Sequence, residues 1–210
     1  MRTMPSSWLV PSRKKGRLRL TVRRRVGTLR GDRVRLEAGP TRAEEKGDSM
    51  GLIVDREAFG ALRDTLDESA RIVFTNGCFD LLHLGHISLL NFARSLGDAL
   101  VIGLNSDASV AVLKGPGRPL VPQEERAAVL AALPAVSFVI IFDELDPVET
   151  IKAVRPHVHV KGGDYRKEDM IETAVVEAQG GEVVLYPLVS GSSTSRLIEM
   201  VRGQDGEAPE

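Results

Sequence analysis

The sequence has little cysteine and no long apolar run. Cys78 is the single cysteine among 210 residues, which excludes an internal disulfide or a zinc site built from several cysteines, and we expect it to be a small buried side chain. No apolar run approaches the roughly 18 residues that a bilayer span requires. The first residues also lack the apolar stretch of a secretory signal. We therefore expect a cytoplasmic protein without a membrane partner.

Acidic residues are scarce in the first part of the chain. Residues 1–50 contain 14 Lys and Arg against 5 Asp and Glu, whereas residues 51–210 contain 14 against 24, so the two parts carry +9 and −10. The basic part has few bulky apolar residues and no sustained periodicity, which predicts a disordered extension. We favour a solvated tail, or residues upstream of a true start at Met50, and expect no nucleic-acid partner. The alternative is an arm that binds nucleic acid or another anionic surface.

The rest of the chain alternates short β-rich runs with segments of helical period. Such an alternation predicts a parallel sheet buried on both faces, with right-handed crossovers. We expect an α/β, Rossmann-like, doubly wound fold with five strands in one domain over residues 51–203, then a flexible tail over 204–210. The expected strands are Arg71–Gly77, Ala99–Asn105, Ser137–Asp143, His157–Gly163 and Glu182–Leu188, and the expected helices are one beginning at Asp55 and Gly85–Leu96, Asp107–Leu113, Gln123–Leu133, Pro147–Val154, Glu168–Gln179 and Thr194–Val201.

Two histidines follow the first of these strands. His83 and His86 lie three residues apart around Gly85, where a helix is expected to begin, and Asp80 precedes them in the loop. Ligands of open α/β sheets bind at the carboxyl ends of strands, and a helix start attracts anions. We therefore interpret the pair as phosphate donors. Local hydrogen bonding and metal ligation are the alternatives, although only Asp80 offers itself as a nearby third ligand.

Other expected strand ends carry compatible chemistry. Asp107 follows the second strand, and the Gly/Pro-rich loop Lys114–Pro119 brings two cations suited to a flap over a polyphosphate. Lys161 and Asp164 flank two glycines after a later strand, and Ser190–Leu197 is a hydroxyl-rich helix start. Each signal is weak alone, but together they predict a site for a phosphorylated ligand.

These motifs resemble a known family. The stretch GCFDLLHLGH, with the later SSTS, is similar to the cytidylyltransferase-like nucleotidyltransferases, whose signature is His-x-Gly-His plus a Ser/Thr-rich helix start. Within this family, the longer stretches RIVFTNGCFDLLHLGH and VKGGDY resemble the heptose 1-phosphate adenylyltransferases. The resemblance covers roughly residues 52–202 and leaves the basic extension outside it. One departure is the neutral YPLVSG, where some members carry an arginine.

The resemblance implies an adenylyl transfer from ATP to a sugar 1-phosphate, with Mg²⁺ held by phosphate oxygens and water rather than by side chains. It also implies a homodimer. Catalytic roles fall on His83, His86 and Lys114, and substrate contacts on Asp107, Arg118 and Arg126. The implied nucleotide contacts are Asn76, Gly77, Phe79, Asp80, Gly85, His86, Lys161, Gly162, Asp164, Ser193, Thr194 and Ser195.

Three alternatives to this function remain open. One is a sibling cytidylyltransferase that acts on a small phosphoalcohol such as glycerol 3-phosphate, because nothing in the residues separates adenine from cytosine. Another is a nucleotide-binding regulatory module without turnover, against which the intact His83 and His86 argue. The last places the activity in the basic arm, and deletion of residues 1–49 would test it.

Overall fold

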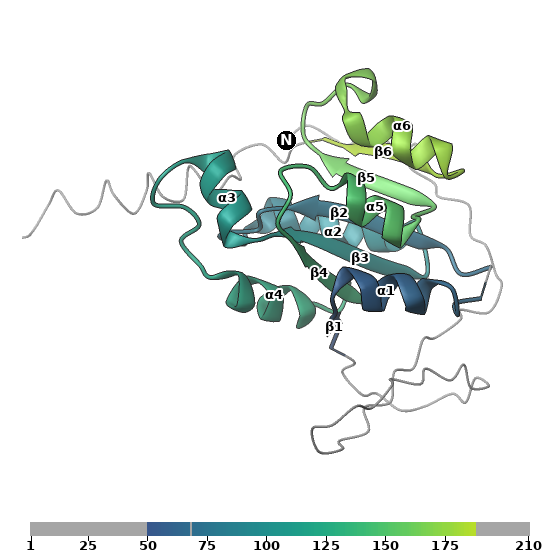
Figure 1. Ribbon diagram of the computed structural model, residues 1–210, viewed down its shortest axis with the longest axis horizontal. Coiled ribbons are helices and arrows are strands. Elements are labelled where there is room, and N and C mark those ends of the chain that lie inside the picture. Colours follow the sequence, from purple (N-terminus) through teal and green to yellow (C-terminus); the bar gives the residue numbers. More distant parts are fainter. Residues whose placement is uncertain (1–49, 68, 188–210) are drawn as a thin grey trace, which may run out of the picture.

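The computed structural model describes residues 50–67 and 69–187. Its centre is one sheet of six parallel strands in the order β1-β4-β3-β2-β5-β6 (Figure 1). Parallel neighbours require long crossover connections, and here these contain the helices. The strands are β1 (Leu52–Ile53), β2 (Ile72–Gly77), β3 (Ala99–Asn105), β4 (Phe138–Phe142), β5 (Val158–Gly162) and β6 (Glu182–Tyr186).

Helices cover both faces of the sheet, and each face has its own apolar core. On one face, α1, α5 and α6 supply Phe59, Ile151 and Val176 to a buried cluster. On the other face, α2 and α4 supply Leu90 and Leu130. This is the doubly wound arrangement that the alternating pattern predicted. The helices are α1 (Arg56–Arg63), α2 (Leu84–Ser95), α3 (Asp107–Lys114), α4 (Gln123–Ala131), α5 (Val148–Val154) and α6 (Ile171–Ala178).

The direction of winding reverses between β2 and β5, and this reversal determines where a ligand crevice is expected. From β2 the chain passes through α2 to β3 on one side, whereas from β5 it passes through α6 to β6 on the other. The loops after these two neighbouring strands therefore diverge. In open α/β sheets, ligands bind in the gap between such diverging loops at the carboxyl ends of the strands.

The sheet has one strand more than the five expected. In β1, Leu52 and Ile53 pair with Phe138 and Val139 at the edge of the sheet. Two residues are too few to produce a recognisable alternation, so the pattern missed them. Gly51 permits this pairing, because a Cβ there would lie 2.8 Å from the carbonyl oxygen of Val136.

The helix expected over residues 168–179 is divided. Lys167–Asp169 form a 3₁₀ turn, and α6 begins only after Met170, which has extended backbone with φ −99° and ψ 119°. The Met170 side chain is buried in the core on the α1, α5 and α6 face. The helix is interrupted where the Met170 side chain enters the core. Periodicity along the sequence could not predict this interruption, because it involves packing against other elements.

Several expectations lie outside the described residues. These are the basic extension, the hydroxyl-rich segment with Ser193, Thr194 and Ser195, the last helix and the tail.

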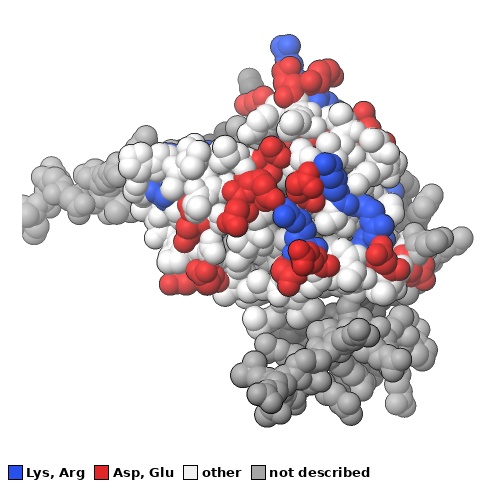
Figure 2. All heavy atoms as spheres, viewed as in Figure 1, with Lys and Arg blue, Asp and Glu red and all other residues white. Residues whose placement is uncertain are grey.

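Within residues 50–67 and 69–187, no helix has both the length and the apolar character of a membrane span. On the face seen in Figure 2, acidic and basic side chains lie next to one another. Among the described residues, ion pairs join Arg155 to Asp64 and Lys152 to Glu149.

Candidate active site

The histidine pair stands at the start of α2, just beyond β2. His83 is the N-cap residue and His86 lies in the first turn. Their rings stack, with centroids 3.9 Å apart and planes inclined by 24°, and the Phe79 ring lies 5.1 Å from that of His86. The two imidazoles therefore form one surface beside the unpaired N–H groups of the helix start, where an anion is favoured.

The turn that leads to the pair is tight. Phe79 has φ +45°, in the left-handed region where a bulky residue is uncommon. A Cβ at Gly77 would lie 3.2 Å from the Phe79 ring, so a larger residue there would push this ring away. Gly77 and Phe79, both expected in the nucleotide site, thus shape the path from β2 to the histidines.

Both imidazoles are neutral at pH 7. Burial lowers the pKa of His83, and burial together with the neighbouring His83 lowers the pKa of His86 to about 4. The Nδ1 atoms of both rings are buried and have no hydrogen-bond partner among the described residues. A neutral ring that carries its proton on Nε2 would keep a donor for a ligand while leaving Nδ1 as an unpaired acceptor.

Asp80 anchors the Gly/Pro-rich loop. Its Oδ1 accepts hydrogen bonds from the backbone N–H groups of Leu120 at 2.8 Å and Val121 at 3.0 Å, and its Oδ2 lies 2.6 Å from Arg118 Nη2. The resemblance implied that Asp80 contacts the nucleotide. In the structure, both carboxylate oxygens of Asp80 contact the loop that carries Arg118.

Substitution of Asp80 by alanine is expected to lower the free energy of unfolding by about 2–4 kcal/mol, because two backbone donors and a cation lose their partner. Asp80→Asn keeps one oxygen acceptor and should cost less. Urea unfolding measures the loss, and trypsin cleavage after Lys114, at the start of the loop, should become faster. Glu125→Ala, an exposed change on α4, is the matched control. Unchanged cleavage in the alanine variant would contradict the anchoring role.

Arg126 is buried inside the protein rather than displayed to a substrate. Its Nε donates to the Val121 carbonyl at 2.8 Å, and its Nη1 donates to those of Cys78 at 2.5 Å and Asn105 at 2.9 Å. Its Nη2 donates to Asp107 Oδ1 at 2.6 Å. The side chain is fully buried. The sequence predicted a substrate contact for Arg126, and in the structure its guanidinium joins the loops after β2, β3 and α3.

The cations expected over a polyphosphate gather around Cys78. Burial raises the pKa of the Cys78 thiol, whereas the charges of Lys114, Arg126 and Arg118 act to lower it. Lys114 is the last residue of α3 and is exposed. Asp107 is half-exposed and paired with Arg126, and its backbone N–H donates to Gln123 Oε1 at 2.8 Å. Lys114 is thus an exposed cation at the end of α3, whereas Asp107 is partly engaged by its ion pair with Arg126.

The β5 side of the crevice contains a second polar group. Lys161 Nζ lies 2.7 Å from Glu172 Oε1 on α6, and 5.5 Å from the centre of the Tyr165 ring. Gly162 faces α2, where a Cβ would lie 3.1 Å from Leu89. Asp164 is exposed in the following loop. The expected residues Lys161, Gly162 and Asp164 therefore stand at the end of β5, beside β2.

Sequence reasoning missed Glu172 and His159. His159 and Lys161 alternate along β5, so they point to the same face of the sheet, toward α6. This alternation of polar residues in an otherwise apolar strand was the available signal. A carboxylate on α6 could not be assigned to them, because which helix covers this face depends on the topology.

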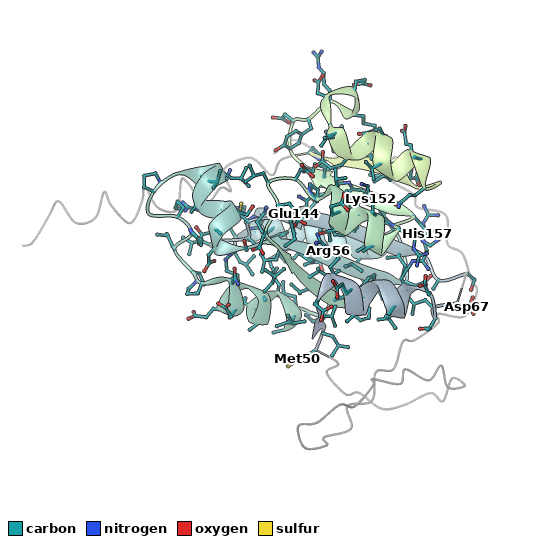
Figure 3. All side chains as sticks on the ribbon, in the orientation of Figure 1. Met50, Arg56, Asp67, Glu144, Lys152 and His157 are labelled. Carbon is teal, nitrogen blue, oxygen red and sulfur yellow. The ribbon has the colours of Figure 1, made fainter. Side chains whose placement is uncertain are left out.

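A separate hollow of about 350 Å³ lies between the carboxyl end of β4 and the start of α1. Arg56 and Glu144, labelled in Figure 3, form an ion pair of 2.5 Å in its wall. None of the described residues expected to bind nucleotide or substrate lines it. This hollow is therefore distinct from the crevice of the histidine pair.

Acid should destabilise the fold through its buried histidines. Burial lowers the pKa of His159 to about 3, and it also lowers the pKa values of His83, His86 and His157. Between these lowered pKa values and about 6.5, the unfolded chain binds more protons than the folded chain. The contribution of the neutral histidines to the free energy of unfolding is therefore complete above pH 6.5 and is lost as the pH falls toward the folded-state pKa values. His159 alone should account for about 2–3 kcal/mol at pH 4.5. Urea unfolding of His159→Gln from pH 7 to 4.5 should show a shallower loss than the parent, and equal slopes would contradict the assignment.

Comparisons with known proteins find similarity over the part of the chain that contains these residues. The cytidylyltransferase-like family model matches residues 74–197. The bifunctional protein HldE of Syntrophotalea carbinolica is 52% identical over 145 residues, which are 67% of this chain and 30% of that protein. That of Geobacter sulfurreducens is 53% identical over 140 residues, 67% of this chain and 29% of that protein. The chain thus spans less than a third of the length of these two relatives.

A solved structure supports the fold alone. The pantoate-beta-alanine ligase from Francisella tularensis, solved with beta-gamma ATP and beta-alanine, superposes with a TM-score of 0.50 at 15% identity. The match covers 69% of each chain. The doubly wound α/β class predicted from the sequence is therefore confirmed by the sheet topology and by this likeness.

Proposed function

The chain belongs to the cytidylyltransferase-like family, and from that premise we propose that it is an adenylyltransferase, which transfers AMP from ATP to a heptose 1-phosphate and releases pyrophosphate. The observation that carries the proposal is the stacked, neutral pair His83 and His86 at the start of α2, where the sheet changes its direction of winding. The resemblance of the longer motifs to heptose 1-phosphate adenylyltransferases supports the choice of sugar and base.

The chemistry needs positioning more than proton transfer. An oxygen of the sugar phosphate attacks the α-phosphorus of ATP in line, a new P–O bond forms, and the bond to the β-phosphate oxygen breaks. A phosphate monoester has its second pKa near 6 and is largely ionised at neutral pH, so no general base is required. Catalysis therefore depends on donors placed where negative charge accumulates.

The residues of the α2 side supply such donors. His83 and His86 would donate to oxygens of the pentacoordinate phosphorus and of the leaving pyrophosphate, together with the helix start at Gly85. Lys114 would approach the phosphates from the end of α3, and Arg118 from the loop that Asp80 anchors. Thr194 and Ser195, beyond the described residues, would hold the β- and γ-phosphates.

A divalent cation should accompany the nucleotide, and we propose Mg²⁺. Within residues 50–67 and 69–187, no three His, Cys, Asp or Glu side chains are grouped so that they could hold a metal. Phosphate oxygens and water are therefore the expected ligands, which suits Mg²⁺. The ion would neutralise phosphate charge, while the protein orients the nucleotide. We further propose a cytoplasmic homodimer.

A panel of nucleotides and acceptors tests the proposal. ATP and CTP are each combined with heptose 1-phosphate and with glycerol 3-phosphate, and pyrophosphate release is measured. We expect turnover with ATP and heptose 1-phosphate only. Turnover with CTP and glycerol 3-phosphate instead would establish the sibling activity, and ATP binding without turnover on any acceptor would establish a regulatory module. The same panel with residues 1–49 deleted should give equal rates, whereas lost activity would place function in the basic arm.

A further inference from the structure

A buried polar cluster lies beneath α6, on the face of the sheet away from α2. Asn76 is two residues beyond Phe74 on β2 and shares its face, which belongs to the core of α1, α5 and α6. His159 and Lys161 lie on the neighbouring strand β5, and Glu172 comes from α6. His159 and Glu172 are 0% and 6% exposed. The proposed chemistry uses none of the charges in this cluster directly.

The hydrogen bonds of the cluster determine which way the Asn76 amide faces. Lys161 Nζ, a group with donors only, lies 3.4 Å from Asn76 Oδ1 and 2.7 Å from Glu172 Oε1. His159 Nε2 lies 3.2 Å from the same Asn76 oxygen and must donate to it, because that oxygen is an acceptor. The resulting tautomer leaves His159 Nδ1 without a proton, which agrees with its being buried and having no hydrogen-bond partner in the described part of the chain.

The nitrogen of the Asn76 amide is left free to bind a ligand. Its oxygen faces two donors, and its Nδ2 has no hydrogen-bond partner among the described residues. Asn76 is half-buried near the carboxyl end of β2, immediately before Gly77 and the turn to the histidines. Two N–H donors are therefore held in one orientation at the crevice.

Charge separates the two sides of the crevice. On the α2 side, Arg118 is paired with Asp80, and the exposed Lys114 and the helix start favour the triphosphate. On the β5 side, Glu172 neutralises Lys161, and burial keeps His159 uncharged at pH 7 by lowering its pKa to about 3. The cluster of Asn76, His159, Lys161 and Glu172 therefore has no net charge, which suits the nucleoside, since the nucleoside carries no charge of its own.

We propose that Glu172 is a positioning residue for nucleotide recognition: by holding Lys161 against the amide oxygen of Asn76, it directs the amide N–H donors to an acceptor atom of the nucleoside half of ATP. This rests on the proposed function only for the identity of the nucleotide. Glu172 acts through Lys161 and Asn76 and does not contact the ligand.

Calorimetric binding of ATP and of inorganic tripolyphosphate tests the inference without any acceptor. Asn76→Asp retains an oxygen for Lys161 and His159 but removes the donors, and should weaken ATP binding about tenfold or more. Glu172→Gln should weaken it about threefold to tenfold, because Lys161 is no longer held. Both variants should bind tripolyphosphate as the parent does. Glu177→Gln, an exposed change on the same helix, is the matched control and should bind ATP normally.

A double variant separates positioning from general stability. If Glu172 acts through Asn76, then Asn76→Asp with Glu172→Gln should bind ATP no more weakly than Asn76→Asp alone. Additive losses, an unchanged ATP affinity in Glu172→Gln, or an equal loss of tripolyphosphate binding would overturn the inference. Should Glu172→Gln fail to fold, Lys161→Met with Glu172→Leu replaces the pair by apolar residues, which is often neutral for stability, and should show the same selective loss. A parent protein that binds CTP but not ATP would defeat the proposed function instead, and the variants are then compared with CTP.

Discussion

Replacement of His86 by alanine is expected to lower turnover at least about a hundredfold, the usual loss for a donor that acts in the transition state. Its ring is stacked on His83 and is neutral, with its pKa lowered to about 4. A neutral N–H already in place stabilises the charge that develops on the phosphorus oxygens without reorganisation. Steady-state pyrophosphate release with ATP and heptose 1-phosphate measures the change. The melting temperature should remain close to that of the parent, because the Nδ1 of the partly buried ring has no hydrogen-bond partner among the described residues that its removal would leave unpaired.

Two further observations separate this role from a structural one. Asn91→Ala, an exposed change on the same helix, should turn over normally. The acceptor phosphate titrates near pH 6, and the histidines should add no further titration near pH 6.5 to the turnover number, since burial lowers the pKa of both rings. An unchanged rate in His86→Ala would remove the pair from the mechanism. An activity limb near pH 6.5 that vanishes in the variant would show that the protonated ring takes part.

Arg126→Met is expected to lower the free energy of unfolding by about 3–5 kcal/mol, the cost of removing one partner from a buried charged network. Three backbone carbonyls and Asp107 share the guanidinium, and a linear side chain cannot replace them. Arg126→Lys should recover only part of the loss, because an ammonium lacks the planar fork. Urea unfolding at constant pH measures both variants.

Glu125→Gln, on the exposed side of the same helix turn, serves as the control and should unfold like the parent. The opposite result is equally specific. If the Arg126 variants keep the stability of the parent and only raise the KM for heptose 1-phosphate, then Arg126 contacts the substrate, as the sequence suggested. Its hydrogen bonds to the three carbonyls and to Asp107 would then be unimportant for stability.

Much of the fold follows from local patterns. Continuous apolar runs separated by helical periods predicted the five strands β2 to β6 with boundaries within a residue or two, because a strand buried on both faces must be apolar along its length. The histidine pair was placed correctly at a helix start, since a strand, a glycine-containing turn and a helix follow one another within a few residues. These features depend on neighbours along the chain.

Other features could not be found in this way. The roles of Asp80 and Arg126 were interpreted as ligand contacts, because a charged residue in a loop or on a helix gives no sign of what it faces. The two-residue β1 and the break at Met170 arise from pairing and burial against distant segments. Glu172 joins Lys161 only because α6 crosses the face to which β5 points.

The amino-acid sequence by itself determined the α/β class, the order of its elements and the chemical type of the site, because periodicity and the residues of a strand-turn-helix junction act over short separations. Only the tertiary structure decided which charges are free and which are already paired. Ion pairs such as Lys161–Glu172 and Arg118–Asp80 join residues 11 and 38 positions apart. Their formation depends on strand order and helix packing, which bring to one edge groups that no local pattern connects.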